Sequence, residues 1–479
     1  MSLKPLTINR KAGAHALAFF LSLIEVKFFH FLSLIEGFFI IFAKMKVNHR
    51  IHLCLAKMSD NGMEQKYIQE AFDSNWVAPL GPNVDAFEEA LARHFDRSGM
   101  KWNGAEKSHS IEGDFSTPLR FARHDVYVAP VISTGADRRS GEISDNDGIS
   151  VAALSSCTAA IHIALLLLGV SKDDEVLCQS FSFCASSNPV TYCGAKPIFV
   201  DSEEETWNMS PELLEKAIKD RIDKTGRKPK AIIVVDLYGM PAKWDEITAI
   251  SRKYDIPVIE DAANALGSTY KGQPCGTFGD IATLSFNGNK IITTSGGGAI
   301  VCHDEATKKR AIFLATQAKE PYLHYEHETI GYNYRMSNIS AGIGRGQMTV
   351  LEKYIAHHKH IHNLYLNLLS TTDCTDLTDV LVQGNPNCDF DSNFWLTTIL
   401  FKQPLDTEAL CLKLDKSGIE ARPLWKPMHL QPVYKNAPAY VNGVSEKLYK
   451  TGICLPSGPW VTDEDVKYIV ETIKSLMNS

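Results

Sequence analysis

Residues 257–298 read PVIEDAANALGSTYKGQPCGTFGDIATLSFNGNKIITTSGGG. The stretch holds two short apolar runs, Pro257–Glu260 and Ile281–Phe286, and polar or charged residues follow each of them at once. Apolar runs of this length are typical of strands that are buried on both faces of a parallel sheet. The stretch therefore predicts two buried strands, with Asp261 and Lys290 at or just beyond their carboxyl ends.

Similar runs occur on both sides of this stretch, and helical patterns lie between several of them. The further runs are Val151–Leu154, Glu175–Cys178, Pro197–Val200, Ala231–Asp236 and Ala299–Cys302, and the helical patterns are Thr158–Leu168, Pro211–Asp220 and Trp244–Tyr254. This alternation predicts an α/β fold, in which helices enclose a large mixed, mostly parallel sheet. Ligands of such sheets bind at the carboxyl ends of the strands, so we expect the site there.

The pattern divides the chain into segments. After Gln347 it changes to a long charged helix and a smaller α+β region, with a strand at Asn393–Phe401 and a closing helix at Glu464–Met477. We expect a large domain at residues 51–345 and a small C-terminal domain at residues 346–479. Residues 96–150 are rich in Gly, Ser, Asp and Arg, and they predict an insertion that forms a surface loop or hairpin.

Residues 1–50 form an apolar extension, in which FLSLIE occurs at 20–25 and again at 31–36. Residues 13–43 are long enough to span a bilayer, but they include Glu25, Lys27 and Glu36, and ionised residues at the centre of a membrane are costly. Three interpretations stay open: sequence that precedes a true start at Met45, an interfacial anchor, or a membrane span.

The composition favours a packed protein that binds small molecules. The chain has 479 residues, 49 of them basic and 56 acidic, for a net charge of −7. This balance offers no basic stripe for a nucleic acid. The 11 cysteines include no CxxC pair, which indicates reduced cysteines in a cytoplasmic protein and no metal site.

Three segments carry residues suited to chemistry. Lys290 precedes the glycine run Gly296–Gly298 and can act as a desolvated Schiff-base lysine, although alone it could be a surface lysine. Asp261 can hold a pyridine nitrogen protonated, but it could equally cap a helix or bind a metal. Ser155–Ala160 opens a helix and suits a phosphate, or is a plain N-cap. The pair of Lys290 and Asp261 on neighbouring strand ends is more specific than either residue alone.

In these segments the sequence resembles the DegT/DnrJ-type sugar aminotransferases, which are enzymes of fold-type I that use pyridoxal 5'-phosphate. The resemblance runs from about Ile51 to the C-terminus without the insertion. It is carried by Trp76–Glu88, Ser155–Ala160, Phe181–Asn188, Glu260–Asn264, Ser285–Gly298, Gly331–Arg335 and Arg422–Pro432. The segments SFNGNKIITTSGGG (285–298) and EQKYIQEAFDSNWVAPLGPN (64–83) look most like the branch that aminates UDP-4-keto-6-deoxy-N-acetylhexosamines in surface-glycan biosynthesis. L-glutamate is the expected donor.

The resemblance implies a role for each matching residue. Lys290 would bind the cofactor aldehyde and act as general acid and base, and Asp261 would pair with the ring nitrogen. The remaining cofactor-binding residues implied are Cys157, Thr158, Phe183, Asn264, Ser285, Asn333 and Arg335. Asn333 would come from the partner subunit, with Arg335 beside it, so the resemblance implies a homodimer with shared active sites.

For the sugar nucleotide, the resemblance implies Trp76, Gly81, His429 and Lys426. One departure is Cys157, which stands where the family usually has Gly and places a side chain near the phosphate. The competing interpretation is a non-catalytic regulatory protein that binds pyridoxal phosphate or a sugar nucleotide on the same scaffold. We expect no nucleic-acid or membrane partner.

Overall fold

The computed structural model describes residues 49–96, 148–370, 380–403 and 405–477. The apolar N-terminal segment and nearly all of the predicted insertion at 96–150 lie outside these residues. By its contacts, Ile51–Ser479 forms one compact unit. Among the described residues, we find no helix that combines the length and the apolar character needed to cross a bilayer.

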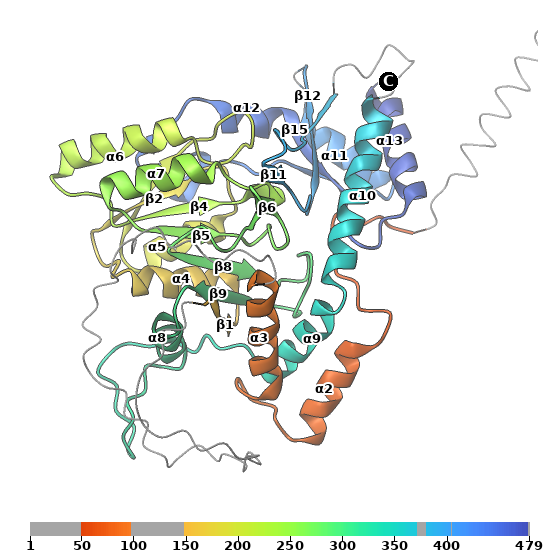
Figure 1. The fold of residues 1–479 in the computed structure, drawn as a ribbon. Coiled ribbons are helices and arrows are strands. Elements are labelled where there is room, and N and C mark those ends of the chain that lie inside the picture. The colour runs from red at the N-terminus through yellow and green to blue at the C-terminus, as the bar shows by residue number, and fades with distance from the viewer. Residues whose placement is uncertain (1–48, 97–147, 371–379, 404, 478–479) are drawn as a thin grey trace, which may run out of the picture. The chain divides into compact units, whose positions relative to one another are not determined.

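The centre of the unit is an eight-stranded sheet with the order β1-β9-β8-β5-β4-β2-β3-β14 (Figure 1). Its strands are β1 (Ser150–Leu154), β2 (Glu175–Gln179), β3 (Lys196–Val200), β4 (Ala231–Val235), β5 (Val258–Asp261), β8 (Ile281–Ser285), β9 (Gly298–Cys302) and β14 (Ala439–Tyr440). Strand β9 runs antiparallel to both β1 and β8, and the other pairs are parallel. The predicted mixed, mostly parallel sheet is confirmed, and β1, β5 and β8 end at the same edge.

Helices cover both faces of this sheet (Figure 1). Alternate residues of β4 show why the strands are continuously apolar: Ile232 packs with one face and Ile233 with the other. The helices of one face are α4 (Cys157–Leu167), α5 (Asn188–Tyr192) and α8 (Glu305–Ala315), and those of the other are α6 (Pro211–Thr225) and α7 (Trp244–Tyr254). Helices α2 (Met63–Asp73) and α3 (Pro82–Asp96) pack against α9 (Asn338–Met348).

The C-terminal part forms a smaller sheet with the order β10-β12-β15-β13. These strands are β10 (Val380–Val382), β12 (Thr397–Phe401), β13 (Arg422–Pro423) and β15 (Gly452–Leu455), and the nearby helices are α10 (Leu351–Ser370), α11 (Thr407–Lys416), α12 (Val444–Thr451) and α13 (Asp463–Met477). The strand predicted at Asn393–Phe401 begins only at Thr397. The residues before it form a loop, because Asn393 bonds to the backbone of Asn264 and Leu266 instead of a neighbouring strand.

Two short elements connect the C-terminal part to the large sheet. Strand β14 extends that sheet beside β3, and β11 (Phe390–Asp391) pairs with β6 (Thr269–Tyr270), which in turn pairs with β7 (Gln273–Pro274). Short 3-10 turns also occur, at Cys184–Ser186, Leu237–Gly239, Met428–Leu430 and Pro432–Tyr434. The division into a large domain at residues 51–345 and a small domain at residues 346–479 stays a prediction.

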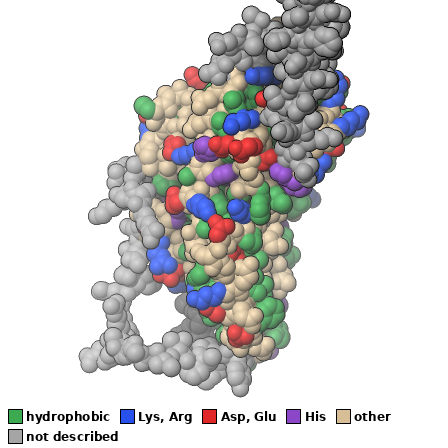
Figure 2. Space-filling model, turned by 90° about the vertical axis from the view of Figure 1, so that its right-hand side faces the viewer, with side chains coloured by type: hydrophobic (Ala, Val, Ile, Leu, Met, Phe, Trp, Pro, Cys, Tyr) green, Lys and Arg blue, Asp and Glu red, His purple; other side chains and the backbone are tan. Residues whose placement is uncertain are grey.

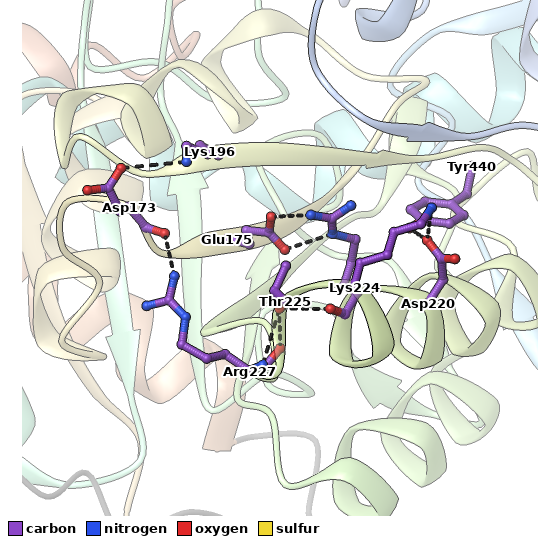
Figure 3. A network of polar contacts seen from close by, with 9 residues as sticks. Asp173, Glu175, Lys196, Asp220, Lys224, Thr225, Arg227 and Tyr440 are labelled. Carbon is purple, nitrogen blue, oxygen red and sulfur yellow. Dashed lines mark hydrogen bonds and ion pairs between the residues drawn. The ribbon is translucent and has the colours of Figure 1, made fainter.

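A polar network on β2, α6 and β14 fixes this edge of the sheet (Figure 3). Arg221 of α6 makes a bidentate contact with Glu175 of β2, with Nη2–Oε1 at 2.6 Å and Nε–Oε2 at 2.8 Å. Tyr440 of β14 donates to Asp220, which also pairs with Lys224 at 2.7 Å. The network connects β14 to α6, which covers one face of the large sheet.

Helix α10 carries the histidine-rich sequence HHKHIH at residues 357–362. His358 and His362 face inward, and burial lowers their pKa values to about 3 and about 4, so both are neutral. His360 faces outward and pairs with Asp463 at 2.7 Å. Figure 2 shows histidine side chains among acidic and basic ones on the side of the molecule that carries α10.

Candidate active site

A pocket of about 560 Å³ opens at the carboxyl ends of β1, β5 and β8. This is where the sheet topology places a ligand. Its lining includes, among the cofactor residues expected from the sequence, Cys157, Thr158, Phe183, Asp261, Asn264, Ser285 and Lys290. The fold thus brings together residues that are up to 133 positions apart (290 − 157).

Lys290 lies in the loop after β8. Its Nζ donates to Asn264 Oδ1 at 2.5 Å and lies 4.1 Å from the centre of the Trp395 ring. Burial lowers the pKa of Lys290 to about 8, and the negative charge of Asp261 opposes this shift. An amine with such a pKa is partly unprotonated near neutral pH, as a nucleophile and proton carrier must be.

Asp261 is the last residue of β5 and is 4% exposed. Its Oδ2 accepts a hydrogen bond from Ser186 Oγ at 2.6 Å, and its Oδ1 accepts one from the Ala263 amide at 3.1 Å. Burial raises the pKa of Asp261, and the bond from Ser186 counteracts that rise. The carboxylate is thereby held in one orientation and can receive a proton-bearing ring nitrogen.

The N-terminus of α4 forms another wall of the pocket. Ser156 caps the helix by accepting from the Ala159 amide at 3.1 Å, while the first amides of a helix have no partner within it. Strand β9 approaches this turn so closely that a Cβ at Gly298 would lie 2.3 Å from Cys157 N. Amides, the hydroxyls of Ser155 and Ser285 and the open glycine loop suit a phosphate group.

The side chain of Cys157 does not crowd this phosphate site. Its thiol points toward the sheet, with Sγ 3.8 Å from Asp261 Oδ1 and 3.6 Å from Thr283 Oγ1. Burial raises the pKa of Cys157, so the group stays a thiol. Cys157 therefore stands at the position where the family usually has Gly without placing its thiol against the phosphate site.

Two further residues expected at the cofactor lie outside the lining. Arg335 is 8% exposed, and its Nη1 donates to Glu88 Oε1 at 2.8 Å and to the Ala153 carbonyl at 2.9 Å. Because its guanidinium is bonded to Glu88 and to the Ala153 carbonyl of β1, Arg335 does not reach the pocket of its own chain. Asn333 is exposed and its backbone bridges to Thr316, so it does not reach the pocket of its own chain.

The residues expected at the sugar nucleotide also lie outside the lining. The carbonyl of Trp76 accepts from Asn338 Nδ2 at 3.0 Å, and Gly81 adopts a φ of 135° against the same side chain. His429 Nδ1 is hydrogen-bonded to Ser180 Oγ at 2.6 Å. Lys426 is half-buried one residue after Trp425, which does line the pocket.

The pocket residues that sequence reasoning did not assign to the site include Ser186, Trp395, Glu420 and Arg422. Ser186 and Arg422 lie in the stretches Phe181–Asn188 and Arg422–Pro432, which carry the family resemblance, so the sequence could have indicated that they belong to the site. Trp395 lies in a segment that was expected to be a strand. Nothing in its local sequence indicates that it covers Lys290.

Three buried side chains near the site are spaced closely enough to hold a metal ion. Asp236, Glu260 and Cys275 bring potential ligand atoms within 4.8 Å of one another. Glu260 accepts the amides of Phe278 and Gly279 at 2.7 and 3.1 Å, so its carboxylate already has donors. Burial and the charge of Glu260 raise the pKa of Asp236. We assign this group to the support of β4 and β5 rather than to a metal.

The pocket residues fit pyridoxal phosphate. The oriented carboxylate of Asp261 suits the ring nitrogen, and the Lys290 amine, with its lowered pKa, suits the aldehyde. The N-terminus of α4 suits the phosphate. The tilted contact between Phe183 and Trp425, at 5.7 Å between ring centres, gives the pocket an aromatic side.

Comparison with known proteins agrees with this fit. A sequence model described as the DegT/DnrJ/EryC1/StrS aminotransferase family matches residues 148–474. EpsN of Bacillus subtilis, whose name assigns it to the pyridoxal phosphate-dependent aminotransferases, is 42% identical over 437 residues, covering 90% of this chain and 97% of EpsN. GDP-perosamine synthase of Escherichia coli O157:H7 is 34% identical over 413 residues, covering 86% of this chain and 95% of the synthase.

The fold comparison gives the same result. A DegT DnrJ EryC1 StrS aminotransferase from Brucella abortus superposes with a TM-score of 0.71 at 25% identity, covering 88% of this chain and 96% of that one. The chain therefore belongs to the DegT/DnrJ/EryC1/StrS aminotransferase family and is a pyridoxal phosphate-dependent aminotransferase.

Proposed function

We propose that this aminotransferase transfers an amino group to a nucleotide-linked 4-keto-6-deoxy sugar, a UDP-4-keto-6-deoxy-N-acetylhexosamine, for surface-glycan biosynthesis in the cytoplasm. L-glutamate is the proposed donor. The observation that carries the proposal is the placement of Lys290 and Asp261 in one pocket of about 560 Å³. The resemblance of residues 64–83 and 285–298 supports the sugar class.

Each residue has a defined task in this proposal. When bound, pyridoxal phosphate supplies an electron-withdrawing ring that stabilises negative charge on the carbon of the substrate amine. Asp261 holds the ring nitrogen protonated, and the amides at the start of α4 hold the phosphate. Lys290 Nζ takes the proton from the donor carbon and later delivers a proton to the sugar carbon, while Asn264 fixes that amine at 2.5 Å.

The substrate side of the proposal includes Arg422 at the pocket wall. Its Nη2 donates to Glu420 Oε1 at 2.9 Å, and its side chain is 64% exposed, so it can also bind a carboxylate or a phosphate. Trp76, Gly81, Lys426 and His429 stay proposed contacts of the sugar nucleotide. Since Asn333 is exposed in its own chain, we propose a homodimer in which Asn333 of the partner subunit completes the phosphate site.

A GDP-linked sugar is the second candidate substrate. The relative named GDP-perosamine synthase supports it, because that protein matches most of this chain. The two candidates differ in the nucleotide that carries the sugar.

The decisive experiment incubates the purified protein and pyridoxal phosphate with L-glutamate and either UDP-linked or GDP-linked 4-keto-6-deoxy sugars. Mass spectrometry of the sugar and assay of 2-oxoglutarate measure the two products. Amination of the UDP-linked sugar, absent in Lys290→Ala, is expected. Amination of the GDP-linked sugar alone would replace the first candidate by the second. Absence of any amination, with no change of the cofactor spectrum on adding amino acids, would instead favour the non-catalytic binding protein.

A further inference from the structure

A loop from the C-terminal part of the chain reaches the active lysine. Asn393, which is fully buried, donates from Nδ2 to the carbonyls of Asn264 and Leu266 at 2.9 and 3.0 Å. Its amide donates to Ser268 Oγ at 2.9 Å. The opposing Gly239 leaves room for this side chain, since a Cβ there would lie 2.0 Å from Asn393 Oδ1. Asn393 thereby clamps the segment that carries Asn264, the hydrogen-bond partner of Lys290.

Trp395 of the same loop contacts Lys290 directly. It is 2% exposed, and the centre of its ring lies 4.1 Å from Lys290 Nζ. The indole Nε1 donates to the carbonyl of Asn289 at 2.6 Å, which fixes the backbone next to Lys290. The amide of Trp395 donates to Asn393 Oδ1 at 2.8 Å. One side chain thus contacts both the amine and the backbone of the lysine loop.

Helix α10 supports the loop from behind. The ring of His362 stacks on Phe394 at 3.6 Å with an angle of 4° between the planes. Burial keeps His362 neutral, so this contact adds no charge to the pocket. The loop is therefore held from two sides, by Asn393 against the large sheet and by Phe394 against α10.

We propose that Trp395 is the positioning residue of Lys290: its ring face holds the protonated amine in place beside Asn264, and its indole N–H fixes the lysine loop. The proposal rests on the proposed function of Lys290. The other groups that face the amine are Asp261 of β5, Asn264, the thiol of Cys157 on α4 and the thiol of Cys54. Asp261 favours the ammonium by its negative charge, and Asn264 accepts a hydrogen bond from it. The ring face of Trp395 adds a cation–π contact to these two interactions.

The test measures Lys290 without cofactor or substrate. Competitive acetylation with acetic anhydride across a pH series, read by mass spectrometry on the peptide that holds Lys290, gives the midpoint of its titration. The exposed Lys216 on α6 serves as the internal reference. In the native chain we expect a midpoint of about 8.

Trp395→Leu is expected to lower this midpoint by about one pH unit, because a desolvated cation–π contact contributes about that much to the ammonium form. Trp395→Phe keeps a weaker ring face and should shift the midpoint by less in the same direction. If Trp395 only excluded water from the pocket, Trp395→Leu would instead raise the midpoint toward 10.5, because entering water would solvate the ammonium. An unchanged or raised midpoint in either variant overturns the proposal. If Trp395→Leu does not fold, Trp395→Phe decides alone.

Trp460→Leu is the matched control. It removes a tryptophan and a cation–π contact with Lys57 at 4.9 Å, outside the pocket lining. Its midpoint at Lys290 should equal that of the native chain. With cofactor, Trp395→Leu should lower kcat about tenfold with little change in KM. If Lys290→Ala keeps its activity, the proposed function fails, yet the labelling result still reports whether Trp395 acts on Lys290.

Discussion

The hydroxyl of Ser186 and the carboxylate of Asp261 form a hydrogen bond of 2.6 Å between Oγ and Oδ2. This bond offsets part of the rise in pKa that burial imposes on Asp261. In Ser186→Ala the pKa of Asp261 should rise further, because the charged form loses its donor. We expect kcat to fall about tenfold and its acidic limb to move to higher pH, as a pH series of initial rates will show.

Ser187→Ala is the control for this change, since the hydroxyl of Ser187 donates to the Cys184 carbonyl and not to Asp261. Its acidic limb should stay in place. A Ser186→Ala enzyme with an unshifted acidic limb would show that the orientation of Asp261 does not depend on this bond.

Lys290 should leave a signature in the stability of the cofactor-free protein. Its pKa of about 8 in the folded chain lies below the ordinary 10.5, so the unfolded chain binds more protons between these values. The free energy of unfolding of the native protein, relative to Lys290→Met, should therefore rise with pH across that window, by up to about 3 kcal/mol. Denaturant titrations at pH 7.5 and 10 measure this difference, and a constant difference contradicts the lowered pKa.

Gly298 should not tolerate a side chain. A Cβ there would lie 2.3 Å from Cys157 N, and backbone cannot yield as a flexible side chain can. Gly298→Ala should lower the free energy of unfolding by about 1–3 kcal/mol and weaken cofactor binding, because it pushes the start of α4 away from β9. Gly384→Ala is the matched control, with open space around its Cβ and a position outside the pocket lining. Equal affinity for pyridoxal phosphate in both variants would argue against α4 as the phosphate site.

The bidentate pair of Arg221 and Glu175 should matter for stability and not for chemistry (Figure 3). Both side chains are nearly buried, at 13% and 12% exposure, so Arg221→Met leaves a carboxylate without its partner. We expect a loss of about 2–4 kcal/mol in urea unfolding. The exposed Lys224→Met, which breaks the pair with Asp220, should cost less than about 1 kcal/mol.

Arg422 should determine how well the enzyme binds an anionic substrate. Arg422→Ala is expected to raise KM about tenfold for the substrate that it contacts, with a smaller effect on kcat, because one charge-assisted hydrogen bond to a carboxylate or phosphate is lost. Separate KM values for L-glutamate and for the sugar nucleotide identify which anion it binds. Arg227→Ala, on the distant edge shown in Figure 3, is the control and should leave both KM values unchanged.

The sequence by itself determined seven of the eight strands of the large sheet, all but β14, and the location of the Lys290–Asp261 pair. Apolar runs such as Ile281–Phe286 are recognisable because a strand buried on both faces tolerates few polar residues. Asp261 and Lys290 could be placed at one sheet edge because parallel strands end at the same side. Both inferences depend on local patterns and on the regular geometry of a sheet.

Only the tertiary structure decided which distant residues reach that edge. Trp395 and Asn393 lie about 100 positions after Lys290 in a segment with strand-like composition, yet hydrogen bonds to Asn264 and Asn289 draw it into a loop over the amine. The guanidinium of Arg335 pairs with Glu88, 247 positions before it in the same chain. Such outcomes follow from the competition among long-range partners for the same polar groups, and the local sequence does not encode which partner prevails.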